Sequence, residues 1–256
     1  NLFRRGESKE VTQSTRQSYL LVLLPVMALA AMMALPPIAQ DPGYHAFADH
    51  RGLLGISSFL NVATNLAFLA AGIAGIGLCA RERHGLGARW AWIVCFTGVA
   101  LVSLGSGYYH LAPSNGTLVW DRLPMSVGFM ALSVAVLSEY VNPRLEKYLL
   151  APAIVLGLAS VIYWHSTDDL RLYVLVQFLP LLMIPAILLL FRSPRKDHGF
   201  LLAALAIYLV SKLAEYYDRA VFGWTGDIIS GHSLKHLLAA TALLVVYEML
   251  RRRTVQ

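Results

Sequence analysis

The stretch Gly105–His110 (GSGYYH) closes one long apolar segment, and the stretch Gly231–His236 (GHSLKH) opens another. Between them, the stretch Trp120–Met125 (WDRLPM) places a carboxylate and a guanidinium in an otherwise apolar run. Ionisable side chains at membrane depth are costly, so their presence there indicates a function. We therefore interpret the rest of the chain outward from these three stretches.

The composition is typical of an integral membrane protein. Of the 256 residues, 57% are hydrophobic and 14% are charged, and the mean hydropathy is +0.58. A soluble domain carries about 25% charged residues. The net charge of +6 is scattered over short loops and forms no basic patch, so we expect membrane lipids, and no nucleic acid, as partners.

Eight apolar segments are predicted to cross the membrane as helices, because most approach the roughly 20 residues that a helical span requires. They are continuously apolar and lack the alternation of a barrel strand, which predicts an all-α integral membrane protein. The segments are 19–36, 59–80, 90–110, 118–139, 148–164, 172–191, 200–217 and 232–250.

The distribution of Lys and Arg supports this count. With both termini in the cytoplasm, fifteen of the 21 basic residues fall in cytoplasmic segments, four in outer segments and two within helices. The positive-inside rule predicts such an excess. The same topology brings the histidines at 110, 232 and 236 and the carboxylate at 121 to the outer face, towards the periplasm or a lumen.

The chain is accordingly divided into five parts. We expect a polar N-terminal tail, an extra transmembrane helix, an outer-face loop or interfacial segment, a core of seven helices and a basic C-terminal tail. Their bounds are 1–18, 19–36, 37–58, 59–250 and 251–256.

Three histidines in these stretches have the pattern of a metal site. His232 and His236 are four residues apart and share one helix face, and His110 adds a third nitrogen. Three protein ligands with a fourth position left to water are typical of catalytic zinc. Asp121 is the available carboxylate that could accept a proton from that water, and Ser106 could hold the water or donate to an oxyanion.

Each of these residues also has a plainer interpretation. An isolated HxxxH pair is a weak signal, and Asp121 could simply cap a helix ahead of Pro124. Ser106 could serve as close-packing contact between helices. Lys212 and Glu215, three residues apart, are interpreted as an ion pair within the bundle. The alternative is that their helix lines a water-accessible cavity beside the metal, with Lys235 close by. A proton-coupled transporter using His and Asp is disfavoured because the inner halves of most helices are apolar.

Together, the three stretches resemble the alkaline ceramidase family, part of the CREST superfamily of membrane hydrolases. The resemblance runs from about Tyr44 to Leu250 and includes Phe59–Leu66 (FLNVATNL), which is similar to the family's FWNxxSNL. It implies a seven-helix CREST-like core to which the first helix is extra. The implied activity is zinc-dependent hydrolysis of ceramide, a sphingolipid, or of a related N-acyl lipid, to a fatty acid and an amine.

By this resemblance, zinc is held by His110, His232 and His236, and Asp121 and Ser106 form the catalytic pair. The alternative function that it implies is a zinc-containing membrane receptor or sensor related to the adiponectin-receptor-like proteins.

The chain departs from the family in three respects. It has the extra first helix, which together with the loop 44–49 (YHAFAD) indicates a bacterial member of the inner membrane. Arg122 stands where the family has Glu. Ser58 stands where the eukaryotic enzymes have a Glu of a calcium site, so calcium near Asp41 and Asp49 is a possible cofactor that the sequence does not favour.

Overall fold

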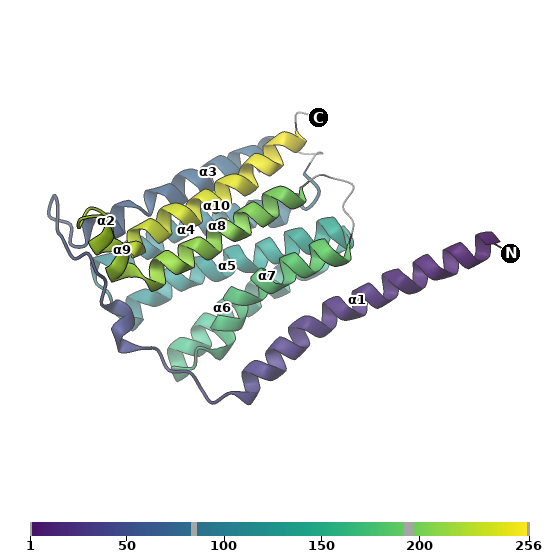
Figure 1. The fold of residues 1–256 in the computed structure, drawn as a ribbon, viewed down its shortest axis with the longest axis horizontal. Coiled ribbons are helices and arrows are strands. Elements are labelled where there is room, and N and C mark those ends of the chain that lie inside the picture. The colour runs from purple at the N-terminus through teal and green to yellow at the C-terminus, as the bar shows by residue number, and fades with distance from the viewer. Residues whose placement is uncertain (1, 83–85, 192–196, 255–256) are drawn as a thin grey trace.

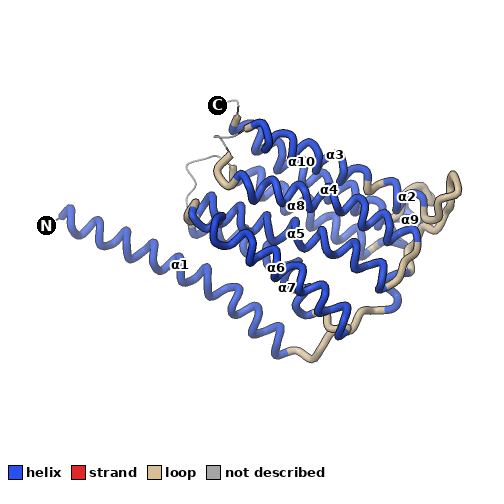
Figure 2. Tube along the Cα trace, turned by 180° about the vertical axis from the view of Figure 1, so that it is seen from behind, coloured by secondary structure: helices blue, strands red, loops and turns tan. Residues whose placement is uncertain are grey.

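The computed structural model describes residues 2–82, 86–191 and 197–254, with side chains described for residue 17 and from residue 19 on. Within these residues the protein is all-helical, without a strand, as Figures 1 and 2 show. The helices are α1 (Leu2–Ala34), the 3-10 helix η1 (Pro42–His45), α2 (Phe59–Ala63), α3 (Leu66–Arg81), α4 (Arg89–Leu111), α5 (Asn115–Tyr140), α6 (Arg144–Thr167), α7 (Arg171–Leu190), α8 (His198–Tyr216), α9 (Asp218–Trp224) and α10 (Gly231–Arg253).

Seven of the described helices are long and apolar enough to cross a membrane, with α2 and α3 forming one of them. The prediction of a seven-helix membrane core is thereby confirmed. The apolar part of α1, Tyr19–Ala34, is shorter than these seven. Its crossing of the membrane, and with it the cytoplasmic location of both termini, stays a prediction.

Six helices close a ring around the centre of the bundle. Neighbours in the ring contact each other in the order α3, α4, α5, α7, α8, α10 and back to α3. The helix α6 packs outside this ring against α5 and α7, and α1 lies against α7 at the edge of the bundle (Figure 1). This closed arrangement leaves room for a cavity between the helices.

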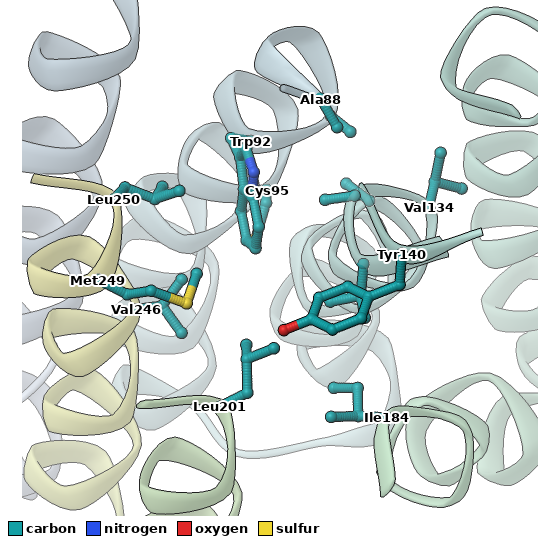
Figure 3. Close-up of a cluster of buried hydrophobic side chains, with 14 of the residues drawn as sticks. Ala88, Trp92, Cys95, Val134, Tyr140, Ile184, Leu201, Val246, Met249 and Leu250 are labelled. Atoms are coloured by element: carbon teal, nitrogen blue, oxygen red, sulfur yellow. The ribbon is translucent and has the colours of Figure 1, made fainter. Parts of the chain in front are cut away.

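The end of the ring far from the histidines is filled by a large apolar core. Trp92 and Cys95 of α4 pack there with Leu201 of α8 and Met249 of α10, and Tyr140 of α5 lies across the same space (Figure 3). Close packing of this kind makes the helix positions hard to shift, because each side chain fills space that its neighbours define.

Two predicted boundaries differ from the structure. The helix α1 begins at Leu2, so residues 2–18 of the predicted tail are helical and continuous with the apolar part of α1. At the other end, α10 extends to Arg253, beyond the predicted core boundary at 250. Arg253 is buried and pairs with Glu139 at 2.8 Å and with Asp197 at 2.7 Å, which explains why the helix continues past the apolar run.

The contact between α4 and α5 depends on Gly105. A Cβ atom at this position would lie 2.0 Å from the carbonyl oxygen of Trp120. The two backbones therefore approach more closely than any larger residue allows, and this brings Ser106 and Asp121 to the same level.

We expect Gly105→Ala to destabilise the protein by about 1–3 kcal/mol, because the two helices must separate to admit the methyl group. Gly107→Ala is the matched control, since a Cβ at Gly107 meets nothing within 4 Å. It should be neutral or stabilising by about 0.5–1 kcal/mol, the helix propensity gained from Gly to Ala. Thermal unfolding in detergent measures both, and equal effects of the two variants would contradict the close contact.

Candidate active site

Three buried imidazoles meet at one end of the ring. Their ring centroids are 4.8 Å apart for His110 and His232, 5.1 Å for His110 and His236, and 4.8 Å for His232 and His236. One ligand nitrogen from each lies within 4.8 Å of the others, so the cluster could hold a metal ion. Two of the rings come from the first turns of α10 and the third from the last turn of α4.

The start of α10 is fixed by its N-cap and by a close backbone contact. The Ser230 hydroxyl accepts the amide hydrogen of Ser233, as an N-cap residue does. Asn61 of α2 receives the Ser233 hydroxyl at 2.7 Å, and its own amide donates to the carbonyl of Asp49 at 3.2 Å. A Cβ at Gly231 would lie 2.0 Å from the Ala214 carbonyl oxygen, so α10 begins directly against α8.

Thr64 determines which nitrogen of His236 is free to bind an ion. Its single hydroxyl hydrogen is donated to the carbonyl of Leu60 at 2.7 Å, and the same oxygen lies 2.9 Å from Nδ1 of His236. The oxygen must therefore accept the Nδ1 hydrogen, which leaves the lone pair of Nε2 available. Ligating histidines in proteins are held by a partner of this kind on the other ring nitrogen.

The nitrogen atoms of the cluster fit a cation. Nε2 of His110 and Nε2 of His232 are 3.2 Å apart. Two nitrogens on a tetrahedral zinc would be about 3.3 Å apart, given Zn–N bonds near 2.0–2.1 Å. Nδ1, the other nitrogen of His110, is buried and has no hydrogen-bond partner among the described residues. The ammonium of Lys235 lies 3.1 Å from Nε2 of His232, so it already supplies positive charge at that lone pair.

Two carboxylates of α8 and α9 support the cluster. Glu215 accepts the ammonium of Lys235 at 2.9 Å and also pairs with Lys212. Asp218 accepts the backbone amide of His232 at 2.7 Å and that of Ala48 at 2.8 Å. Glu215 thus forms the predicted ion pair with Lys212, but it also bridges to α10.

Neither Glu215 nor Asp218 was predicted to support the site, and Thr64 was also missed. The spacing of Lys212 and Glu215 indicates a pair within one helix, and it carries no information about the second lysine on α10. Thr64 could have been found as the hydroxyl within the stretch Phe59–Leu66.

Ser106 and Asp121 face each other across the close contact between α4 and α5. Both side chains are buried, and both line the same cavity. The capping interpretation of Asp121 is wrong, because α5 begins at Asn115. Its N-cap is Ser114, which forms a capping box with Thr117.

A cavity of about 320 Å³ runs from these residues into the ring. At the end near the histidines its lining is polar and includes Ser106, Asp121 and His236. Further in, the lining is apolar and comes from all six helices of the ring. Examples are Phe68, Val99, Phe129, Leu181, Leu205 and Leu243. The volume is within the range of ligand pockets, about 300–1,000 Å³.

The segment that follows η1 covers the histidine cluster. The ring of Phe47 lies 4.8 Å from the ring of His110 and 4.5 Å from that of His232, measured between centroids. His45 joins Tyr109 at 2.8 Å and Asn115 at 3.0 Å, so it ties the segment to α4 and α5. The predicted interfacial loop therefore lies directly against the candidate site.

The acidic groups of this segment already have partners. Asp49 is buried, and the guanidinium of Arg51 contacts its two oxygens at 2.9 and 2.8 Å. This guanidinium holds the pKa of the Asp49 carboxyl below its usual range. Asp41 accepts the backbone amide of Gly43. Among the described residues, the histidine cluster is the group of side chains that could hold a metal ion. The structure therefore does not support a calcium site near Asp41 and Asp49.

Seven helices that are long and apolar enough to cross a membrane indicate a multi-pass membrane protein, and its buried histidine cluster could hold a metal ion. The sequence model of the family described as Ceramidase matches residues 53–254, and the chain belongs to this family. Membership implies hydrolase activity and a lipid substrate. A search of curated proteins finds no match to the chain.

We expect Thr64→Val to weaken metal binding by about 10- to 100-fold, because the partner that orients His236 is lost while the volume is kept. Thr64→Ser, which retains the hydroxyl, is the matched control. His236→Ala should remove the metal altogether, and His165→Ala, at an exposed position, should leave it bound. Competition with a chelator followed by elemental analysis measures the occupancy. Equal affinity in the Val and Ser variants would show that Thr64 has no part in the site.

The Asp49 carboxyl should make stability depend on pH. Its pKa is lowered in the folded protein, so the ionised form stabilises the fold above the unfolded pKa of about 3.9. This contribution is lost as the pH falls through the folded value. Asp49→Asn lacks the carboxylate and therefore this contribution at every pH. The difference in melting temperature between the parent and this variant should shrink below about pH 4. Melting curves with a chelator present test this, and a constant difference down to pH 3 would contradict it.

Proposed function

We propose that the protein is a zinc-dependent lipid amide hydrolase of the ceramidase type. The observation that carries this proposal is the position of Ser106, Asp121 and His236 together at the polar end of an otherwise apolar cavity. Family membership supports the lipid substrate and the hydrolase class. The apolar part of the cavity can enclose an acyl chain. The polar residues at its end can act on an amide bond as acids, bases and hydrogen-bond donors.

His110, His232 and His236 would hold the zinc. When bound, the ion supplies a Lewis acid that polarises the amide carbonyl and lowers the pKa of a water molecule. The side chains of the cluster are held rigid by their neighbours, with Thr64 orienting His236 and Phe47 packed on the other two rings. Such support is what keeps a metal site in its productive geometry.

Asp121 is the group that we assign to proton transfer. Its carboxylate accepts the proton that the attacking water releases, and it then returns a proton to the nitrogen of the leaving amine. General acid–base catalysis of this kind contributes about 10²–10⁴-fold. Ser106, on the neighbouring helix, is the donor that we assign to the oxygen of the amide carbonyl as negative charge develops on it.

The acyl chain of the substrate would occupy the apolar part of the cavity. Each buried methylene group contributes about 0.8 kcal/mol to binding through its removal from water. Phe47 and the rest of the segment 46–51 close the site from outside and reduce the access of bulk water. Ceramide, or a related N-acyl lipid of the sphingolipid type, has the required amide between an acyl chain and a polar amine.

The active site is proposed to face the outer side of the membrane, towards the periplasm or a lumen. The support for this is the excess of basic residues in the opposite loops, which the positive-inside rule assigns to the cytoplasm. The bacterial inner membrane as the location stays a prediction.

Asp121→Asn should reduce turnover by about 10²–10⁴-fold while the zinc content stays at one per chain. Ser106→Ala should cost about 10²–10³-fold, the usual effect of removing an oxyanion donor. The measurement is release of fatty acid from ceramide and from a panel of other N-acyl lipids by purified protein in detergent, with His165→Ala as the control.

Full zinc content without release from any of these lipids would contradict the proposal and would favour a receptor or sensor. Retained turnover in Asp121→Asn would leave the hydrolase standing but would remove Asp121 from its assigned role.

A further inference from the structure

Arg122 is a buried cation without a carboxylate partner. It is 5% exposed, and within the described residues no carboxylate oxygen forms an ion pair with it. One of its terminal nitrogens, Nη2, donates to the amide oxygen of Gln40 at 2.7 Å. The other, Nη1, is buried and has no partner. Leaving a charged group in this state is costly, which indicates that something else completes its surroundings.

The guanidinium is held in place by aromatic rings. Its central carbon lies 4.0 Å from the ring centroid of Trp164, 4.6 Å from that of Tyr173 and 5.6 Å from that of Tyr44. Gln40 is itself fixed, because its side-chain amide donates to the Asp41 carbonyl. Rings and a neutral amide orient a guanidinium but do not neutralise it. The unpartnered edge is therefore presented in a fixed orientation.

Arg122 lines the same cavity as Ser106 and Asp121. Adjacent residues of a helix point about 100° apart, so the guanidinium lies to one side of the reacting groups rather than among them. It lies against the rings of Tyr44 and Tyr173, which line the cavity together with Ser106 and Asp121. A substrate with its acyl chain in the apolar part would place its polar end near Arg122.

The charge of the cavity lining points the same way. Its basic residues other than histidine are Arg122, Lys212 and Lys235, and its acidic residues are Asp121 and Glu215. Lys212 and Lys235 share Glu215, and Asp121 faces Ser106. A divalent ion on the histidines would add further positive charge. The polar end thus has an excess of positive charge that a ligand can balance.

We propose that Arg122 binds an acidic group, a carboxylate or a phosphate, on the amine half of the lipid substrate. This inference rests on the proposed function for the identity of the reaction, and it names the substrate class as an N-acyl lipid with an anionic headgroup. The planar fork of a guanidinium matches a carboxylate or phosphate through two parallel hydrogen bonds, which an ammonium cannot reproduce. Arg122 is a specificity residue in this scheme and takes no part in proton transfer.

The test compares two lipids that share one acyl chain, N-palmitoylglycine and N-palmitoylethanolamine, which differ in a carboxylate against a hydroxymethyl group. The parent protein should prefer the acidic lipid in kcat/KM. Arg122→Gln should lower the ratio of the two values by about ten- to a hundredfold, the contribution of a hydrogen bond to a charged group. The ratio for Arg122→Lys should lie between those of the parent protein and Arg122→Gln, because lysine keeps the positive charge but cannot form the two parallel hydrogen bonds of a guanidinium.

Using the ratio removes general effects of a substitution on folding or metal content, since both lipids are measured on the same preparation. The matched control is Arg219→Gln, which removes a positive charge at the same end of the molecule from an exposed position outside the cavity lining. It should leave the ratio unchanged. A ratio near one in the parent protein, or a ratio that Arg122→Gln does not alter, would overturn the inference.

Two further arms separate the alternatives. Inhibition by palmitate, the other source of a carboxylate, should not depend on Arg122; if it does while the substrate ratio stays constant, the residue binds the product and the inference is wrong. If neither lipid is hydrolysed, the proposed amidase is judged by the release of fatty acid from ceramide, and equilibrium binding of the same two lipids to the same variants still decides the role of Arg122. Tighter binding of the acidic lipid that Arg122→Gln abolishes would support it, and equal binding would refute it.

Discussion

The structure depends on the cost of enclosing ionisable side chains within an apolar helix bundle. Three histidines, two lysines and several carboxylates lie at one end of the ring, and each needs a partner within hydrogen-bonding distance. The helices approach closely enough to provide those partners where Gly105 and Gly231 allow backbone contact. The close approach at Gly105 aligns Ser106 with Asp121, and that at Gly231 sets His232 beside Glu215. Packing and electrostatics at this end therefore cannot be varied independently.

The sequence predicts the helices of the core and the histidine cluster well, and it does so for physical reasons. The spacing of His232 and His236 guarantees one shared face, and the alternation of loops guarantees that His110 reaches the same level. What it cannot predict is how far each helix is rotated about its axis. The bridge from Glu215 to a second helix and the bond from Thr64 to His236 depend on that rotation.

The mistaken capping interpretation of Asp121 has a similar origin, as have the two shifted helix boundaries. A carboxylate ahead of a proline is an ordinary start signal for a helix, but α5 begins about two turns earlier, at the capping box of Ser114 and Thr117. The end of an apolar run indicates where a helix leaves the lipid, but the backbone hydrogen bonds of the helix can continue beyond that point. The helix α10 thus continues through Arg251 and Arg252 to Arg253, which is enclosed by Glu139 and Asp197.

Each end of the ring contains a cation of low solvent exposure, and the two cations differ in whether carboxylates pair with them. This difference distinguishes a structural ion pair from a candidate binding group. At the end far from the histidines, Glu139 accepts hydrogen bonds from both Trp92 and Arg253, and Asp197 also pairs with Arg253, so two carboxylates contact this cation. These two carboxylates balance the charge of Arg253 without a ligand. At the histidine end, the guanidinium of Arg122 is oriented by neutral groups and borders a cavity. The positive charge of Arg122 is not balanced by a carboxylate, and a ligand of opposite charge that enters the cavity would balance it. The free-energy cost of burying an unpaired charge therefore favours ligand binding at this position.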